Sequence, residues 1–475
     1  MVSRWKKWPA AGVAMAAVML AACGGDSNSS PKADLRVIHA AGNAPAVNVK
    51  VNGAALDDAQ GLRYGEATDS ETVRANTYSV SVDARLPGGA VTEVVAPEDI
   101  TLAPRTTTTV VAIGNVGDMG ATAFGPTVIV SDNESVAPSN TRVQIVHASA
   151  AAETAVPAGV SVYVTAPGAD LSEATPTTTF NLRGFTDPLT VPAGQYQIRI
   201  TPAGSVTPVF DSGEITLPGG ADLMVLALDS HGPGAPVKLL VSTGDDDDDF
   251  FIVDRNAPAE VRVVHAASGV GAAEVFASSE SLSLPVTEVI DSFDYRESEP
   301  LADLDPAADY RFVVNADGGG AVGAPIDVSP VALAGARYYT ALAAGNLADG
   351  ITLLLDEDDR RSVATEARVR AIHAASLAGT VDVFINAAGS VTVNSIELGE
   401  VAPALDGFDY QDITGYLSLA AGSYDIRVGV PSDGGGYDVA IDLTGVALAD
   451  GDIVSLVATN PATPGAEFEF IVLAD

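Results

Sequence analysis

Four histidines end short apolar segments that are each followed by alanine. The segments read LRVIHAA, VQIVHAS, VRVVHAA and VRAIHAA, and their histidines are His39, His147, His265 and His373, spaced 108, 118 and 108 residues apart. Histidine can ligate a metal ion or act as a general base. Here no second His or Cys stands at ligand spacing, and the chain contains no H-E-x-x-H, C-x-x-C or G-x-S-x-G motif.

The register of these segments favours a structural role for the histidines. Leu35 and Val37 lie at alternate positions before His39, so in a strand the imidazole shares their core-facing side. Arg36 points to the opposite face. We expect each histidine to be neutral, to bond a loop carbonyl and to hold the turn that follows.

Acidic runs are the second group of residues that could do chemistry. The candidate calcium ligands are Asp245, Asp246, Asp247, Asp356, Asp358 and Asp359, in runs placed between the second and third and the third and fourth copies of the motif. Hard carboxylate oxygens suit Ca²⁺, but consecutive aspartates do not match a defined loop with spaced ligands. A solvated, extended linker is the other interpretation.

No segment predicts catalysis. Residues 318–323 formally fit G-x-G-x-x-G, but Pro325 and a strand-like stretch follow them instead of a helix, which favours a hairpin loop. Scattered carboxylates such as Glu297 and Asp303 are expected by chance in a chain with 62 acidic residues. We therefore predict a non-enzymatic protein.

The elements around the histidines have an apolar period of two, which predicts short strands. A mid-repeat strand carries an equivalent tyrosine in each copy, namely Tyr78, Tyr196, Tyr310 and Tyr424. Its context is similar to the tyrosine corner of sandwich domains, where the phenol bonds nearby backbone. We predict an all-β protein of four tandem Ig-like antiparallel β-sandwich domains, arranged like beads behind a lipoprotein signal peptide. The predicted segments are 1–22 (signal peptide), 23–32 (tether), 33–140, 141–258, 259–365 and 366–475 (sandwich repeats).

The N-terminus predicts export and lipidation. Basic residues precede an apolar stretch from Ala10 to Leu20, and Leu20-Ala21-Ala22-Cys23 resembles the bacterial lipobox. That resemblance implies cleavage before Cys23, lipidation of its thiol and attachment to a lipid bilayer. Gly24 and Gly25 resemble the pattern of lipoproteins sent to the outer membrane, with a periplasmic or cell-surface location. Cys23 is the only cysteine, so no disulfide supports the domains.

Charge narrows the range of partners. The net charge is −38 at pH 7, which repels nucleic acid and anionic headgroups, so no nucleic-acid partner is expected. Both tryptophans lie in the signal segment. Any aromatic surface on which a sugar ring could stack would therefore have to be built from tyrosine and phenylalanine. The third copy, with Tyr295, residues 296–309 and Tyr338-Tyr339, is the most divergent and the first place to seek an exposed binding surface.

Together, the His-Ala strands, the V-x-V strands that follow them and the acidic tails resemble bacterial proteins assigned to domain of unknown function 4397. The likeness covers nearly all of the chain beyond the signal, although Gln144 stands where the other copies have arginine. It implies an Ig-like sandwich and points to no particular activity. We expect a cell-envelope spacer or adhesive scaffold that presents a surface to an unidentified protein or glycan. A binding module for envelope polysaccharide or calcium is the alternative, and no cofactor other than calcium is expected.

Overall fold

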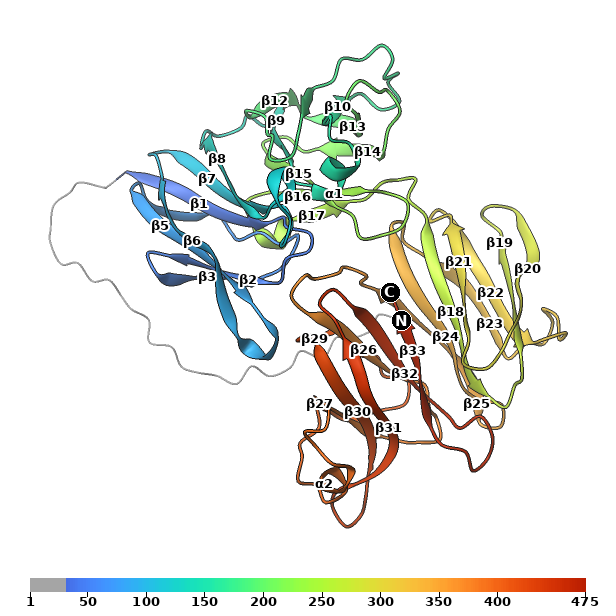
Figure 1. Cartoon of the computed structure of the whole chain (residues 1–475). Helices are drawn as coiled ribbons and strands as arrows, with labels where there is room; N and C mark the ends of the chain where they lie inside the picture. The colour runs from blue at the N-terminus through green and yellow to red at the C-terminus, as the bar shows by residue number, and fades with distance from the viewer. Residues whose placement is uncertain (1–30) are drawn as a thin grey trace.

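The structure is a computed structural model that describes residues 31–475, so the predicted signal peptide and Cys23 lie outside the described residues. Strands dominate and pair into eight sheets, which form four two-sheet, sandwich-like units (Figure 1). The all-β sandwich prediction is confirmed. Within the described residues, no helix combines the length and the apolar character needed to cross a membrane.

Unit 1 shows the common plan. Its strands are β1 (Lys32–His39), β2 (Val47–Val51), β3 (Ala54–Leu62), β4 (Glu71–Arg74), β5 (Thr77–Arg85), β6 (Val91–Thr101), β7 (Thr106–Ile113) and β8 (Gly125–Asp132). One sheet has the order β4-β1-β7-β8 and the other β3-β2-β5-β6. The short 3-10 turns η1 (Pro87–Gly89) and η2 (Gly120–Thr122) lie in its connections.

Unit 2 keeps this plan and adds a helix and a ninth strand. Its elements are β9 (Asn140–His147), α1 (Ala150–Ala155), β10 (Val160–Thr165), β11 (Thr178–Phe180), β12 (Leu189–Pro192), β13 (Gly194–Pro202), β14 (Phe210–Leu217), β15 (Asp222–Asp229), β16 (Val237–Ser242), η3 (Asp246–Asp248) and β17 (Phe250–Ile252). The sheets run β12-β9-β15-β16-β17 and β11-β10-β13-β14.

Units 3 and 4 repeat the eight-strand arrangement. Unit 3 comprises β18 (Ala259–Ser268), β19 (Ala273–Ser279), β20 (Leu284–Phe293), β21 (Ser298–Leu304), β22 (Asp309–Ala316), β23 (Ile326–Ala332), β24 (Arg337–Asn346) and β25 (Gly350–Asp358). Unit 4 comprises β26 (Ala367–His373), β27 (Val381–Ala387), α2 (Val393–Glu397), β28 (Leu405–Phe408), β29 (Leu417–Leu419), β30 (Gly422–Pro431), β31 (Tyr437–Leu448), β32 (Ile453–Thr459) and β33 (Glu469–Ala474).

One strand pair in each unit runs parallel. The His-Ala strand β1 pairs in parallel with β7, and the same holds for β9 with β15, β18 with β24 and β26 with β32. The other strand pairs of the described residues are antiparallel. The antiparallel pairing expected from the sequence therefore holds except at one strand pair per unit, which the first and seventh strands form.

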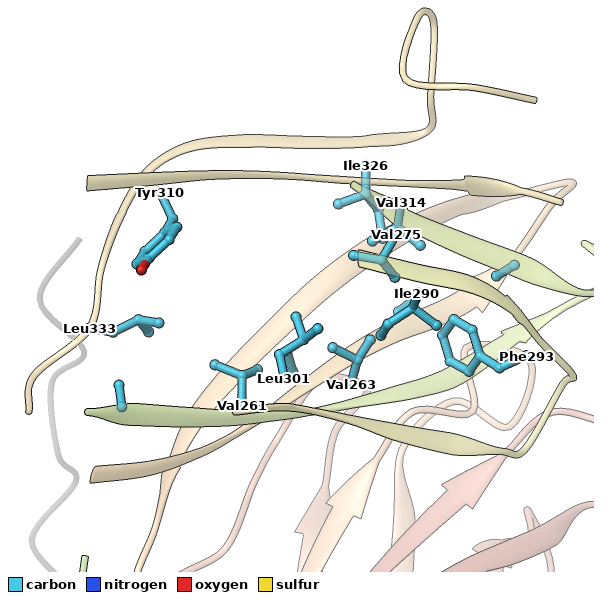
Figure 2. Close-up of a cluster of buried hydrophobic side chains, with 14 of the residues drawn as sticks. Val261, Val263, Val275, Ile290, Phe293, Leu301, Tyr310, Val314, Ile326 and Leu333 are labelled. Carbon is cyan, nitrogen blue, oxygen red and sulfur yellow. The ribbon is translucent and has the colours of Figure 1, made fainter. Parts of the chain in front are cut away.

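Each unit has its own apolar core between its two sheets. In unit 3, Val261 and Val263 from β18 face Val275 and Val314 from the opposite sheet, and Phe293 closes one end (Figure 2). The inward residues alternate along the strands, as expected for two half-buried sheets. The other units have equivalent clusters.

The tyrosine-corner prediction is confirmed in three units. Tyr78, Tyr196 and Tyr424 each donate a hydrogen bond of 2.8–2.9 Å to the backbone carbonyl four residues earlier. In unit 3 the bond runs the other way, because the Tyr310 hydroxyl accepts from the backbone N–H of Asp305 at 2.8 Å.

The units are packed in pairs instead of lying like beads. A cluster that includes Ile38 and Val111 of unit 1 and Val146 and Leu226 of unit 2 is fully buried between the two units. Val264 and Ile372 belong to the matching cluster between units 3 and 4. The bead arrangement was wrong because the His-Ala strands carry buried apolar residues on both faces. One face lines the unit's own core and the other lines the junction with its neighbour.

Contacts beyond the two pairs bring all four units around a common centre (Figure 1). Ala235 and Ala257, near the end of unit 2, pack on Ala336 of unit 3. The connection between units 3 and 4 returns to unit 1, where Arg361 donates to the carbonyl of Ala44 at 3.0 Å and Ala364 N–H donates to that of Asn43 at 2.8 Å.

Candidate functional site

The histidines of units 1, 3 and 4 have the same bonding pattern. Their Nε2 atoms lie 2.7–2.9 Å from the loop carbonyls of Pro45, Gly271 and Gly379. Their Nδ1 atoms accept from the backbone N–H two residues later. Because Nδ1 accepts, the ring proton sits on Nε2 and donates to the loop. This geometry ties the end of the strand to the loop beyond it.

His147 of unit 2 departs from this pattern. Its Nδ1 accepts from Ser149 N–H at 3.4 Å, but its Nε2 has no hydrogen-bond partner in the described residues and lies 4.0 Å from the Glu153 carboxylate. Helix α1 places Glu153 where the other units have a loop carbonyl. The carboxylate is already bound, since it accepts from Leu182 N–H at 2.9 Å.

Burial keeps these rings neutral. It lowers the pKa of His39 to about 4 and that of His147 to about 4, and it also lowers the pKa values of His265 and His373. In residues 31–475, the side chains grouped closely enough to hold a metal ion are Asp69, Asp245 and Asp246. The histidines do not form part of that group.

The aspartate run 245–249 lies inside unit 2, not between the second and third units, because β17 follows it as a further strand of the same sheet. Its loop contacts unit 1, where Asp69 accepts from Asp246 N–H at 3.0 Å. Burial, and then the nearby Asp69 carboxylate, raise the pKa of Asp246. Two of the predicted calcium ligands, Asp245 and Asp246, therefore lie close to Asp69, which was not predicted as a ligand. Asp247 stays outside the group.

The second set of predicted calcium ligands faces arginines. Asp356 and Asp358, which lie in β25 rather than in a linker, accept from Arg370 at 2.9 and 2.5 Å. Asp359 accepts from Arg368 at 2.6 Å. The Asp358 side chain is fully buried and also lies 3.5 Å from Arg262. Guanidinium groups thus supply the positive charge that a calcium ion would bring.

The tyrosines that mark unit 3 as divergent are partly buried and engaged in contacts, so they do not form an open aromatic surface. Tyr295 packs against His265 and donates to the carbonyl of Asn460 in unit 4 at 2.6 Å. Tyr338 stacks under Arg360, and the Tyr339 hydroxyl accepts from Ala334 N–H. Residues 298–304 form β21, the ordinary fourth strand of the unit.

The glycine-rich segment 318–323 connects the antiparallel strands β22 and β23. Gly318, Gly320 and Gly323 have positive φ values of 70–76°. The hairpin interpretation of this segment is confirmed, and glycine is required there by the left-handed backbone.

A cavity of about 210 Å³ lies where units 1, 2 and 3 meet the connection to unit 4, and we call it the central cavity. Its wall carries basic and aromatic side chains and three carboxylates. They are Tyr64, His231, Lys238, Phe251, Arg337, Tyr338, Arg360, Arg361, Glu357, Asp358 and Asp359. No local sequence pattern predicts this site, because its residues come from three units and a connection.

Comparison with known families agrees with this architecture. A family profile described as "Domain of unknown function (DUF4397)" matches residues 33–156, 259–384 and 385–475, which together exceed half of the chain. The chain belongs to this family. The DUF4397 matches leave residues 157–258 uncovered, which is most of unit 2, the unit whose histidine lacks a loop carbonyl. No curated protein matches the chain.

Proposed function

We propose that this DUF4397 protein is a non-enzymatic lipoprotein of the cell envelope, a scaffold of fixed shape that presents an interaction surface to a protein or glycan. The observation that carries the proposal is the pairwise packing of the units. A buried apolar junction holds each pair together, and contacts around the central cavity link the two pairs. A scaffold needs such fixed geometry.

The lipobox-like sequence that ends at Cys23 supports attachment to the outer membrane, on its periplasmic or outer side. The test is expression of the full chain in a Gram-negative host grown with a radiolabelled fatty acid. The wild-type chain should carry the label and sediment with membranes, whereas Cys23→Ser should be unlabelled and released. Incorporation of label into Cys23→Ser, or none in the wild type, would contradict the proposal.

Calcium binding is the second candidate, and one observation favours it. Asp69 of unit 1 lies with Asp245 and Asp246 of unit 2, so a divalent cation there would relieve repulsion across the junction. Calorimetric titration with CaCl₂ tests it, with Asp246→Asn as the variant that removes one ligand and Asp433→Asn, in an exposed loop of unit 4, as the control. The absence of heat at millimolar calcium would exclude this function.

A further inference from the structure

The central cavity concentrates positive charge in a strongly acidic chain. The protein has 24 Lys and Arg residues against 62 Asp and Glu. Four of these basic residues, Lys238, Arg337, Arg360 and Arg361, nevertheless line one cavity, together with the carboxylates of Glu357, Asp358 and Asp359. Three carboxylates beside four cations leave part of this positive charge for another group to offset.

Lys238 is the group without a partner. Among the described residues, no carboxylate oxygen lies within 4.0 Å of its Nζ and no hydrogen-bond acceptor is in reach. The ammonium instead lies 4.5 Å from the centre of the Phe251 ring and 5.1 Å from that of Tyr64. Two aromatic faces hold the cation in place, but they do not neutralise it.

The acids of the cavity wall are bound to arginines. Asp358 pairs with Arg370, which lies beyond the wall, and with Arg360 of the wall at 3.2 Å. Asp359 pairs with Arg368, which also lies beyond the wall. Glu357 accepts from Arg337 at 2.7 Å. These pairings leave the positive charge of Lys238 and Arg361 uncompensated by carboxylates in direct contact.

His231 adds a polar group that lacks a partner. Its Nε2 is buried and has no hydrogen-bond partner in the described part of the chain, and its ring packs edge-on against Tyr64. Burial, followed by Lys238 and Arg361, lowers its pKa to about 4, so the ring is neutral and can donate one hydrogen bond. Burial, followed by Arg337, lowers the pKa of Lys238 to about 8, which leaves the ammonium predominant at neutral pH.

We propose that the central cavity binds a small oxyanion, a phosphate or a carboxylate group, with Lys238 as its main charged contact. The volume suits a small ligand, because it exceeds the space of one water several-fold and falls below that of ordinary drug-sized pockets. The oxyanion would offset the charge of the Lys238 ammonium. Because three units line the cavity, its binding would also stabilise the assembled arrangement.

Calorimetric titration of the mature chain with inorganic phosphate tests this site, with citrate as the carboxylate arm and chloride at equal ionic strength as the blank. We expect saturable binding of one equivalent of phosphate or citrate. Lys238→Met should weaken binding at least about tenfold. Lys32→Met, which removes an exposed lysine at the start of β1, should bind like the wild type.

A second variant guards against misfolding. If Lys238→Met loses its far-ultraviolet circular dichroism, Lys238→Arg keeps the charge and should keep most of the binding. Absence of saturable heat with both phosphate and citrate at millimolar concentration would overturn the proposal. Binding by a folded Lys238→Met variant as tight as that of the wild type would overturn it equally.

Discussion

The Tyr64 hydroxyl donates a 2.7 Å hydrogen bond to the backbone carbonyl of Asp229, 165 residues further along the chain and in the next unit. Tyr295 and Asn460 make the same bond at 2.6 Å, again 165 residues apart. The junction between units 1 and 2 is therefore built again between units 3 and 4. The chain repeats as a pair of units, which accounts for the alternating 108- and 118-residue spacing of its histidines.

Tyr64→Phe should weaken the first junction by about 1–3 kcal/mol, because it leaves the buried carbonyl of Asp229 without a donor. Hydrogen exchange followed by mass spectrometry on peptides of β1 and β15 measures this local loss. Tyr295→Phe should show the same effect in β18 and β32. Since the two junctions share no residues, their effects should add in the double variant. Loss of protection in both junctions from either single variant would contradict the duplication.

His265→Ala should destabilise unit 3 by about 2–4 kcal/mol, because it removes both loop hydrogen bonds and leaves a cavity under the strand. His147→Ala is the matched comparison. It should lower the free energy of unfolding by less than His265→Ala does, since Nε2 of His147 has no hydrogen bond to lose. Hydrogen exchange of β18 and β9 gives both values. An undiminished protection of β18 in His265→Ala would argue against the structural role of the motif.

Stability should fall as the pH drops below about 6.5 toward 4. Burial lowers the pKa of His39 to about 4, so the unfolded chain binds the proton first and acid favours unfolding. Between pH 7 and pH 5 the protonation of this single group should lower the free energy of unfolding by about 2 kcal/mol. Urea unfolding at both values measures the loss. His39→Gln should lose correspondingly less over the same interval. An equal loss in His39→Gln would show that other groups cause the pH dependence.

Arg370→Gln introduces the amide that unit 2 carries at Gln144 and removes the main partner of the buried Asp358. It should cost about 3–5 kcal/mol, because a fully buried carboxylate is left with poorer pairing. Arg311→Gln breaks the exposed pair with Asp327 and should cost less than about 1 kcal/mol. Urea unfolding compares the two. If both variants lose similarly little stability, Arg262 and Arg360 suffice to balance the charge of Asp358.

Local patterns in the sequence predict much of each unit. Alternation of apolar residues predicts the strands, the equivalent tyrosines predict the corner, and the position of His39 after Leu35 and Val37 predicts that its ring faces the core. These features depend on residues close together in the chain. The parallel pairing of β1 with β7 depends on segments about 70 residues apart, so the local alternation carries no information about it.

The junctions are visible in the residues on the outer face of the His-Ala strands. Ile38 and Ala40 are apolar although they face away from the core of unit 1, and a strand buried on both faces must pack against a second partner. The partners of Asp358 could not be identified in the same way. Any of the chain's arginines could have paired with it, and only the folding of β25 against β26 selects Arg370. The central cavity depends in turn on the arrangement of the units.

Small-angle X-ray scattering on the purified Cys23→Ser chain tests the packed arrangement most directly. Four units packed around a common centre should give a radius of gyration of about 30 Å or less. Four beads in a row would give a value of about 40 Å. A value near the lower figure, unchanged by moderate salt, supports the fixed scaffold. A value near the higher figure would contradict the buried junctions and the scaffold that rests on them.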